Sequence, residues 1–357
     1  MDVSRINIKF LSTVKIPSSM LNNFYTHLCF SFFWGFCLTY FAFRFLNSLG
    51  FIDSPNSRSL HVKPTPTSGG IAIVLSLWIS ISHSPFLFHE LYPWLFASSA
   101  FSVLGLIDDY KSRTVFFRLT FQFVIGGALI FWIIFNQESS TQNQLLFYFA
   151  ALFLSVTLVA VVNLFNFMDG SDGLAGAQSL IYFLCFTFMF DLLGLRSLTF
   201  LALGMSGVVL GFMIFNWPPA KIFMGDSGSY LLGSLHFAFG CSYYLSGNGI
   251  SFPLILAAPF LCDSVLTLAH RFFTSQNWWQ AHRGHCYQLL IMNGMLPRNL
   301  VLALITLHLT CTIPLAFLSF VYSEFSLYFL FATYSVISLI WYYLKKNMPR
   351  RASEEYG

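Results

Sequence analysis

The chain has 357 residues, of which 56% are hydrophobic and 19% aromatic, whereas only 9% carry a charge. Soluble domains carry roughly 25% charged residues, so this composition excludes a disordered chain, a coiled coil and almost any water-soluble enzyme. The net charge of +4 is modest, and we interpret the basic residues as a topology signal, with no nucleic acid as a partner. The sequence therefore predicts a polytopic protein embedded in a lipid bilayer.

Apolar segments of helical length follow one another along the chain. They are continuously apolar and lack the alternation that transmembrane barrel strands require, so they predict an all-α transmembrane helical bundle. A spanning helix needs about 20 apolar residues, and we predict about 11 spans, or 10 because several segments are short or interrupted by Gly or Pro. The segments are 24–46, 70–88, 91–107, 117–135, 145–163, 175–190, 198–215, 229–246, 251–270, 299–320 and 325–344.

The domain organisation is simple. Residues 1–22 contain basic residues but no apolar core with a cleavage site, so we expect an uncleaved N-terminal tail. Residues 23–345 form a single membrane-embedded domain, followed by a C-terminal tail at 346–357. Lys and Arg residues concentrate in one set of alternate loops and in the C-terminal tail, so the positive-inside rule places these loops and the C-terminus in the cytoplasm.

Acidic and basic side chains gather in the same five loops, which predicts one composite site at the cytoplasmic face. In the first loop Lys63 precedes Gly69-Gly70, and we expect the bare glycine amides at the start of the next helix to approach an anion. A basic turn that anchors on lipid headgroups is an equally good interpretation of this loop.

The second loop contains two adjacent carboxylates at the end of an apolar segment, Asp108 and Asp109, followed by Arg118 in the next span. Adjacent carboxylates at a membrane surface are costly unless a cation satisfies them. They also raise each other's pKa, which suits a metal site or a base. The alternative is that they only end a helix in water.

The third loop begins with polar residues that recur every three positions, Asn163, Asn166 and Asp169, and therefore share a helix face. Asp172 follows in the sequence Asp-Gly-Ser-Asp-Gly. This run lacks the twelve-residue spacing and terminal Glu of an EF-hand, so we reject a calcium loop. Turn chemistry explains the glycines but not the repeated Asn and Asp.

The fourth loop reads Phe223-Met224-Gly225-Asp226-Ser227-Gly228-Ser229. A serine-protease interpretation fails, because that chemistry needs a His–Asp pair on a secreted scaffold, whereas this sequence opens a membrane helix. Asp226 or Ser227 can act as the helix N-cap, and a capping carboxylate can also bind a metal.

The last loop contains His282, Arg283 and His285. Together with Cys286 these residues are too few for a zinc site, whose fourth ligand is not visible. Cationic capture of a pyrophosphate fits the pattern better, because an Arg guanidinium can bind two phosphate oxygens at once.

The four ordered motifs resemble those of the polyprenyl-phosphate N-acetylhexosamine-1-phosphate transferases. The motifs are Asp-Asp, Asn-x-x-Asn-x-x-Asp-Gly-x-Asp-Gly-Leu, Phe-Met-Gly-Asp-Ser-Gly-Ser and a late His-Arg-x-His, and the similarity spans roughly residues 50–290. The last loop is more similar to the branch that initiates O-antigen synthesis than to the peptidoglycan translocase. Thr67 departs from the family pattern, since many relatives have a basic residue there.

The resemblance implies a reaction and roles for individual residues. A UDP-N-acetylhexosamine and undecaprenyl phosphate would give the lipid diphosphate sugar and UMP, and thereby initiate a cell-envelope polysaccharide such as the O-antigen of lipopolysaccharide. The implied metal ligands for Mg²⁺, with Mn²⁺ as an alternative, are Asp226 and Asn166. The implied catalytic residues are Asp108, Asp109 and Asp169, and the implied substrate-binding residues are Asp172, Phe223, His282, Arg283, His285, Arg118 and Lys63.

The resemblance also implies a multi-pass protein of the bacterial inner membrane and allows a homodimer. The competing interpretation is a membrane transporter of an anionic substrate. Transporters place polar residues on broken helices at the bilayer midplane, whereas the polar residues here lie at one face.

Overall fold

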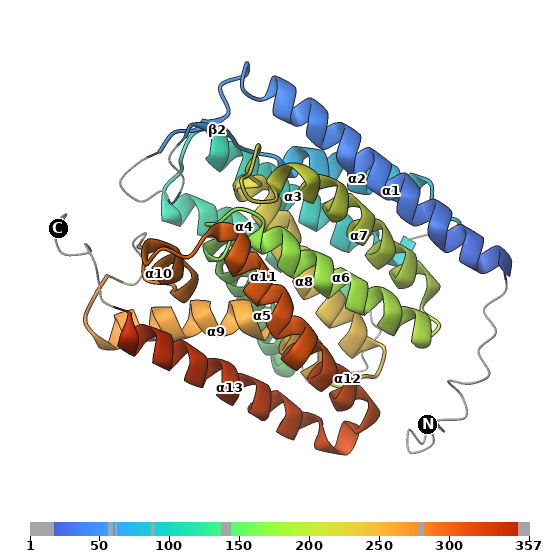
Figure 1. Ribbon diagram of the computed structural model, residues 1–357. Helices are drawn as coiled ribbons and strands as arrows, with labels where there is room; N and C mark the ends of the chain where they lie inside the picture. The colour runs from blue at the N-terminus through green and yellow to red at the C-terminus, as the bar shows by residue number, and fades with distance from the viewer. Residues whose placement is uncertain are drawn as a thin grey trace.

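The computed structural model describes residues 18–55, 60, 63–86, 89–136, 144–277 and 282–348, which form a helical bundle (Figure 1). Each apolar segment predicted from the sequence contains a helix, although in segment 70–88 the helix ends at Ser82, so the prediction of an all-α membrane bundle is confirmed. In chain order the elements are α1 (Ser18–Phe45), β1 (Ile52–Asp53), β2 (Thr65–Pro66), α2 (Gly70–Ser82), η3 (His89–Leu91), α3 (Tyr92–Tyr110), α4 (Val115–Asn136), α5 (Gln144–Phe167), α6 (Leu174–Leu192), α7 (Arg196–Asn216), α8 (Gly225–Leu245), α9 (Ser251–Phe273), α10 (Cys286–Met292), α11 (Pro297–Leu307), η4 (His308–Thr312), α12 (Ile313–Val321), η5 (Ser323–Phe325) and α13 (Ser326–Asn347).

Nine helical segments among the described residues are long and apolar enough to cross a membrane. Two of the eleven predicted segments are not in this set: α2, which has only 13 residues, and α8, which has 21. The sequence of α8 contains serines and glycines, and its side chains pack against other helices instead of lipid. The helices are therefore confirmed, and the number of crossings stays a prediction.

Helix α8 runs through the middle of the bundle (Figure 1). It packs most extensively on α3 and α5 and also contacts α2 and α6. Its core-facing side chains, such as Tyr230, Leu231 and Leu235, are almost completely buried. In contrast, α13 lies on the outside, where Phe331 and Leu339 are 67% and 68% exposed. An outer face of large apolar side chains is what contact with lipid requires.

Two glycines bring α2 and α3 into backbone contact with the first turn of α8. A Cβ atom on Gly70 of α2 would lie 2.0 Å from the amide nitrogen of Gly228, and one on Gly105 of α3 would lie 2.3 Å from the carbonyl oxygen of Asp226. Only glycine permits such close approach. The end of α3, which carries the paired carboxylates, therefore lies beside the start of α8.

The expectation that the Gly69-Gly70 amides meet an anion is wrong. Both amides donate to backbone carbonyls of the segment before α8: Gly69 to Phe223 and Gly70 to Met224, each at 2.9 Å. Since these N–H groups already have partners, they are not available to a phosphate. The glycines instead fix how α2 meets α8.

A short β-hairpin closes the same end of the bundle. β1 and β2 pair antiparallel, with Ile52 opposite Pro66 and Asp53 opposite Thr65. The carbonyl of Pro66 accepts a hydrogen bond from the Phe223 amide at 2.8 Å. The hairpin, the loop before α8 and the ends of α3 and α5 thus lie together, at the end of the bundle that also carries α10 (Figure 1).

The predicted N-terminal tail, 1–22, overlaps a helix, because α1 begins at Ser18. Residues 1–17 lie outside the described residues. At the other end, α13 extends to Asn347, so the first residues of the predicted tail 346–357 are helical, and 349–357 are not described.

The glycine contact between α3 and α8 gives a stability prediction. We expect Gly105→Ala to destabilise the fold by about 1–3 kcal/mol, because the added methyl group must displace the Asp226 backbone. Gly127→Ala in α4 is the matched control, since a Cβ there meets no atom within 4 Å, and it should be neutral or slightly stabilising. Thermal unfolding in detergent measures both, and equal melting temperatures would contradict the contact.

Candidate active site

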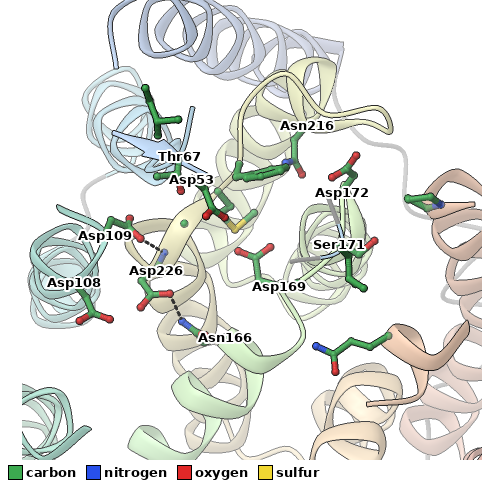
Figure 2. Close-up of a pocket in the computed structure, with 18 of the residues that line it drawn as sticks. Asp53, Thr67, Asp108, Asp109, Asn166, Asp169, Ser171, Asp172, Asn216 and Asp226 are labelled. Atoms are coloured by element: carbon green, nitrogen blue, oxygen red, sulfur yellow. Dashed lines mark hydrogen bonds between the residues drawn. The ribbon is translucent and has the colours of Figure 1, made fainter. Parts of the chain in front are cut away.

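A pocket of about 580 Å³ opens at the end of the bundle where the hairpin and α10 lie. Its lining combines residues from α3, α5, the loops that flank α6 and α8, the hairpin and α10. Figure 2 shows Asp109, Asp226 and Asn166 at one side, Asp172 and Asn216 at the other, and Asp169 between them. Six carboxylates line this one pocket: Asp53, Asp108, Asp109, Asp169, Asp172 and Asp226. The composite site predicted from separate loops is therefore formed in large part.

Asp109 caps the first turn of α8 from the neighbouring helix α3. Its Oδ1 accepts the amide of Asp226 at 2.8 Å, and its Oδ2 accepts the amide of Ser227 at 3.2 Å and the hydroxyl of Ser68 at 2.9 Å. A carboxylate at a helix N-terminus satisfies unpaired N–H groups and interacts favourably with the helix dipole. The sequence predicted a cap from Asp226 or Ser227, and the structure supplies it from Asp109 instead.

Asp226 lies in the first turn of α8 and points into the pocket (Figure 2). Its Oδ1 accepts a hydrogen bond from Nδ2 of Asn166 at 2.8 Å, and the same nitrogen donates to the Ser229 hydroxyl at 3.1 Å. Its Oδ2 lies 3.7 Å from Nη1 of Arg118. Asn166 therefore orients Asp226 through its amide nitrogen, and Oδ2 is the oxygen that faces a cation.

Asp108, although adjacent to Asp109, has different partners. Its Oδ1 accepts the backbone amide of Arg113, and its Oδ2 accepts a hydrogen bond from Arg118 Nη1 at 3.1 Å. The side chain is almost completely buried. Arg118 thus lies between Asp108 and Asp226, in contact with both, which places this predicted residue in the site.

Asp169 is the carboxylate with the fewest interactions. Among the described residues it accepts no hydrogen bond, although it lies in the centre of the pocket (Figure 2). Burial, together with the negative charges of Asp226 and Asp109, raises the pKa of Asp169 well above its usual range. A carboxylate in this environment favours either a proton or a bound cation.

The far side of the pocket is organised by two residues that join its loops. Asp172 Oδ2 accepts the amide of Ala220 at 2.9 Å. Asn216, at the end of α7, accepts the amide of Gly173 at 3.1 Å and donates to the carbonyl of Ile222 at 2.9 Å. These contacts hold the segment in which Phe223 presents its half-buried ring to the pocket. Asp172 and Phe223 thus line the same pocket, and their roles in substrate binding stay predictions.

The loop with two histidines lies beside the pocket but does not line it. Asp263 of α9 caps α10, since its carboxylate accepts the amides of Cys286 at 2.8 Å and Tyr287 at 3.2 Å. Tyr287 in turn donates its hydroxyl to the Phe167 carbonyl at 3.0 Å, which ties α10 to the end of α5. Asp263 therefore has a structural role.

The two imidazoles of this loop stack with ring centroids 4.9 Å apart. Burial, with nearby positive charge, lowers the pKa of His282 to about 3 and that of His285 to about 4. Both rings are therefore neutral at neutral pH. In this loop Arg283 is therefore the side chain that we expect to carry the positive charge, and pyrophosphate capture by the loop stays a prediction.

The remaining residues of the prediction lie outside the pocket lining. Lys63 is exposed on the loop between β1 and β2, and His282, Arg283 and His285 lie in the segment that leads into α10. Arg118 contacts Asp108 and Asp226 but is not itself part of the lining. Six polar residues that line the pocket had no predicted role: Asp53, Thr67, Ser112, Ser171, Asn216 and Gln288. Asn216 ends an apolar segment just as Asp108 does, so the same signal would have found it. Gln288 lies in a short helix and carries no such signal.

The donor set fits a small, hard cation such as Mg²⁺. Among the described residues no three acidic, histidine or cysteine side chains converge into a cage made by protein alone. Mg²⁺ needs no such cage, because it keeps several waters and binds through one or two carboxylates plus substrate phosphates. The guanidinium of Arg118 already lies beside Asp226 Oδ2, and the raised pKa of Asp169 marks an excess of negative charge that a cation would relieve.

Comparison with known proteins identifies the family. A family model described as glycosyl transferase family 4 matches residues 91–243, which include α3 through most of α8. A phospho-N-acetylmuramoyl-pentapeptide-transferase of Prochlorococcus marinus is 31% identical over 256 residues, 63% of this chain and 70% of that protein. The chain belongs to the polyprenyl-phosphate N-acetylhexosamine-1-phosphate transferases.

Two other relatives are named for a different activity. An undecaprenyl-phosphate alpha-N-acetylglucosaminyl 1-phosphate transferase of Thermotoga maritima is 29% identical over 71% of this chain and 77% of its own length. A probable undecaprenyl-phosphate N-acetylglucosaminyl 1-phosphate transferase of Bacillus subtilis is 27% identical over 73% and 75%. This membership, with a pocket at one end of the bundle, argues against the transporter interpretation.

The environment of Asp169 predicts that its carboxylate lowers the stability of this folded transferase although turnover needs it. Because its pKa is raised, the folded protein binds a proton more tightly than the unfolded chain, and stability falls as pH rises between the usual and the raised pKa. Asp169→Asn removes this cost, so the melting temperature in EDTA at neutral pH should rise by a few degrees while turnover falls. An unchanged or lower melting temperature would contradict the account.

Proposed function

We propose that the protein transfers N-acetylhexosamine 1-phosphate from a UDP-sugar to undecaprenyl phosphate and releases UMP. The observation that carries this proposal is Asp226, which Asn166 holds at the first turn of α8 in a pocket lined by five further carboxylates. The names of the relatives in Thermotoga and Bacillus support undecaprenyl phosphate as the acceptor and an N-acetylhexosamine 1-phosphate donor. Family membership supports the transfer of a sugar phosphate.

The chemistry exchanges one phosphoanhydride for another. An oxygen of the acceptor phosphate attacks the sugar-bearing phosphorus, and the UMP oxygen leaves with the electron pair of the broken P–O bond. Catalysis of such a transfer is chiefly positioning and neutralisation of charge. Mg²⁺, or Mn²⁺, held by Asp226 with Asp169 nearby, would neutralise phosphate oxygens and orient the donor.

Different residues of the chain have different roles in this reaction. Arg118 is the cation that we expect to bind a phosphate oxygen, since it lies between Asp108 and Asp226 at the pocket wall. A phosphate monoester has a second pKa of about 6, so the acceptor is already largely ionised at neutral pH. The acceptor therefore needs positioning more than a base. Asp169, which has no hydrogen-bond partner among the described residues, is the carboxylate best placed to help, and Asp108 is a weaker candidate because both its oxygens are engaged.

The uridine part of the donor is assigned to the opposite side of the pocket. Phe223 offers an aromatic face for stacking on uracil, while Asp172 and Asn216 supply polar atoms at its edge. Stacking of a base on an aromatic side chain contributes about 1–3 kcal/mol. This arrangement directs the pyrophosphate of the donor toward Asp169 and Asp226.

The setting of the reaction is part of the proposal. We place the pocket at the cytoplasmic face of the bacterial inner membrane with the C-terminus inside, on the strength of the Lys and Arg bias of its loops. The product would initiate O-antigen synthesis, on the strength of the His-Arg-x-His loop. One chain contains the whole pocket, and a homodimer stays a prediction.

A second donor is favoured by one observation. The relative in Prochlorococcus is named for transfer of phospho-N-acetylmuramoyl-pentapeptide, and it is 31% identical to this chain. Incubation of the purified protein with undecaprenyl phosphate and each candidate UDP-sugar separates the two. A lipid diphosphate product from UDP-N-acetylhexosamine supports the proposal, whereas a product formed only from the muramoyl-pentapeptide donor would replace it.

The role of Asp226 is tested by exchange of labelled UMP into the UDP-sugar in the presence of undecaprenyl phosphate. We expect Asp226→Asn to lower the exchange rate at least about 100-fold, because the substitution removes the charge that would hold the metal. Asp191→Asn is the matched control: this carboxylate pairs with Arg196 at the end of α6 and is remote from the pocket. Near-normal exchange in Asp226→Asn would refute the metal role.

A further inference from the structure

The guanidinium of Arg118 lies where we expect a divalent cation to neutralise the carboxylates of the pocket. Its Nη1 is 3.1 Å from Asp108 Oδ2 and 3.7 Å from Asp226 Oδ2. Asp226 has its other oxygen engaged by Asn166. Asp226 Oδ2, the oxygen that does not accept this hydrogen bond, is the oxygen that Arg118 faces.

The two cations would repel each other at this distance. Both partners of Arg118 are at least partly buried, and charges in such surroundings are screened far less than charges in water. A metal ion on Asp226 Oδ2 would leave the guanidinium close to a second positive centre. Either the guanidinium or the metal can therefore interact strongly with Asp226 Oδ2, but the two cannot do so together.

We propose that Arg118 competes with the divalent metal for Asp226 and so couples metal binding to phosphate binding. In the substrate-free protein, Arg118 neutralises Asp226 and weakens the affinity for the metal. A phosphate group in the pocket attracts the guanidinium away from Asp226 and frees the carboxylate. The metal then binds more tightly when a phosphate is present, and by linkage the phosphate binds more tightly when the metal is present.

This proposal rests on the proposed function for the identity of the metal and the phosphate, but it makes a separate statement. The proposed function gives Arg118 only a contact with substrate. Competition predicts in addition that removal of Arg118 strengthens a binding event, whereas loss of a binding residue normally weakens one. A measurement of metal binding without the UDP-sugar therefore tests it independently of turnover.

The test is Mn²⁺ binding to the full chain in detergent, followed by the electron paramagnetic resonance signal of free Mn²⁺. We expect Arg118→Gln to bind Mn²⁺ about tenfold more tightly than the wild type, within the range of couplings between two sites. A short-chain alkyl phosphate should strengthen Mn²⁺ binding to the wild type and have little effect on Arg118→Gln. Asp226→Asn should lose the site in either background.

Arg113→Gln is the matched control. It removes the same charge from the segment just before α4, but the Arg113 side chain lies over the Phe117 ring and its backbone amide is what contacts Asp108. Its Mn²⁺ affinity should equal that of the wild type. Equal tightening in Arg113→Gln would show a general charge effect and overturn the proposal.

Further outcomes also decide the matter. Affinity in Arg118→Gln equal to or weaker than that of the wild type would overturn the competition, as would failure of every variant to bind Mn²⁺. If Arg118→Gln does not fold, Arg118→Met takes its place: it also removes the positive charge that faces Asp226 Oδ2, so its Mn²⁺ affinity should exceed that of the wild type. Wild-type affinity in Arg118→Met would then contradict the proposal. Loss of UMP exchange with tightened Mn²⁺ binding supports it, while a wild type without exchange refutes only the proposed function.

Discussion

The carboxylate of Asp109 on the first turn of α8 is the contact around which the pocket is arranged. Helix α8 begins inside a bundle that is mostly apolar, where unpaired N–H groups are costly because water is scarce. Asp109 satisfies two of these groups from the end of α3, and Ser68 of the segment before α2 bonds to the same carboxylate. Three segments are thereby locked together, and the backbone of Asp226 is fixed by the cap.

The same device appears a second time in the fold. Asp263 of α9 accepts two amides at the start of α10, and α10 forms one wall of the pocket. In both places an aspartate from one helix caps the N-terminus of another helix. The cap thus sets the position of a loop that carries polar residues. Carboxylates that accept backbone amides, such as Asp109, therefore lie next to Asp226 and Asp169, whose carboxylates accept none among the described residues.

The electrostatics of the pocket follow from this division. Asp109 is compensated by amides, Asp108 by Arg118 and an amide, and Asp172 by an amide. Asp226 and Asp169 have less compensation, and burial raises the pKa of Asp169. A pocket with this distribution of charge attracts cations to its centre, which is where the proposed transfer needs a metal to accept phosphate oxygens.

Much of this could be predicted from the sequence, since apolar segments determine helices in a bilayer and polar residues at the ends of those segments gather at one face. The sequence placed Asp108, Asp169, Asp172, Phe223 and Asp226 in one site, and they line one pocket. It could not predict that Asp109 caps α8, because the partners are 117 residues apart. It also could not show that His282 and His285 are buried, and this burial lowers the pKa of both rings.

The cap by Asp109 is tested most directly by hydrogen–deuterium exchange of the peptide that contains the first turn of α8. In Asp109→Ala the amides of Asp226 and Ser227 lose their acceptors, so exchange in this turn should accelerate. The adjacent substitution Asp108→Ala, which removes no acceptor from α8, should leave it unchanged. Equal protection in Asp109→Ala and the wild type would contradict the account, because α8 would then keep its position without the carboxylate.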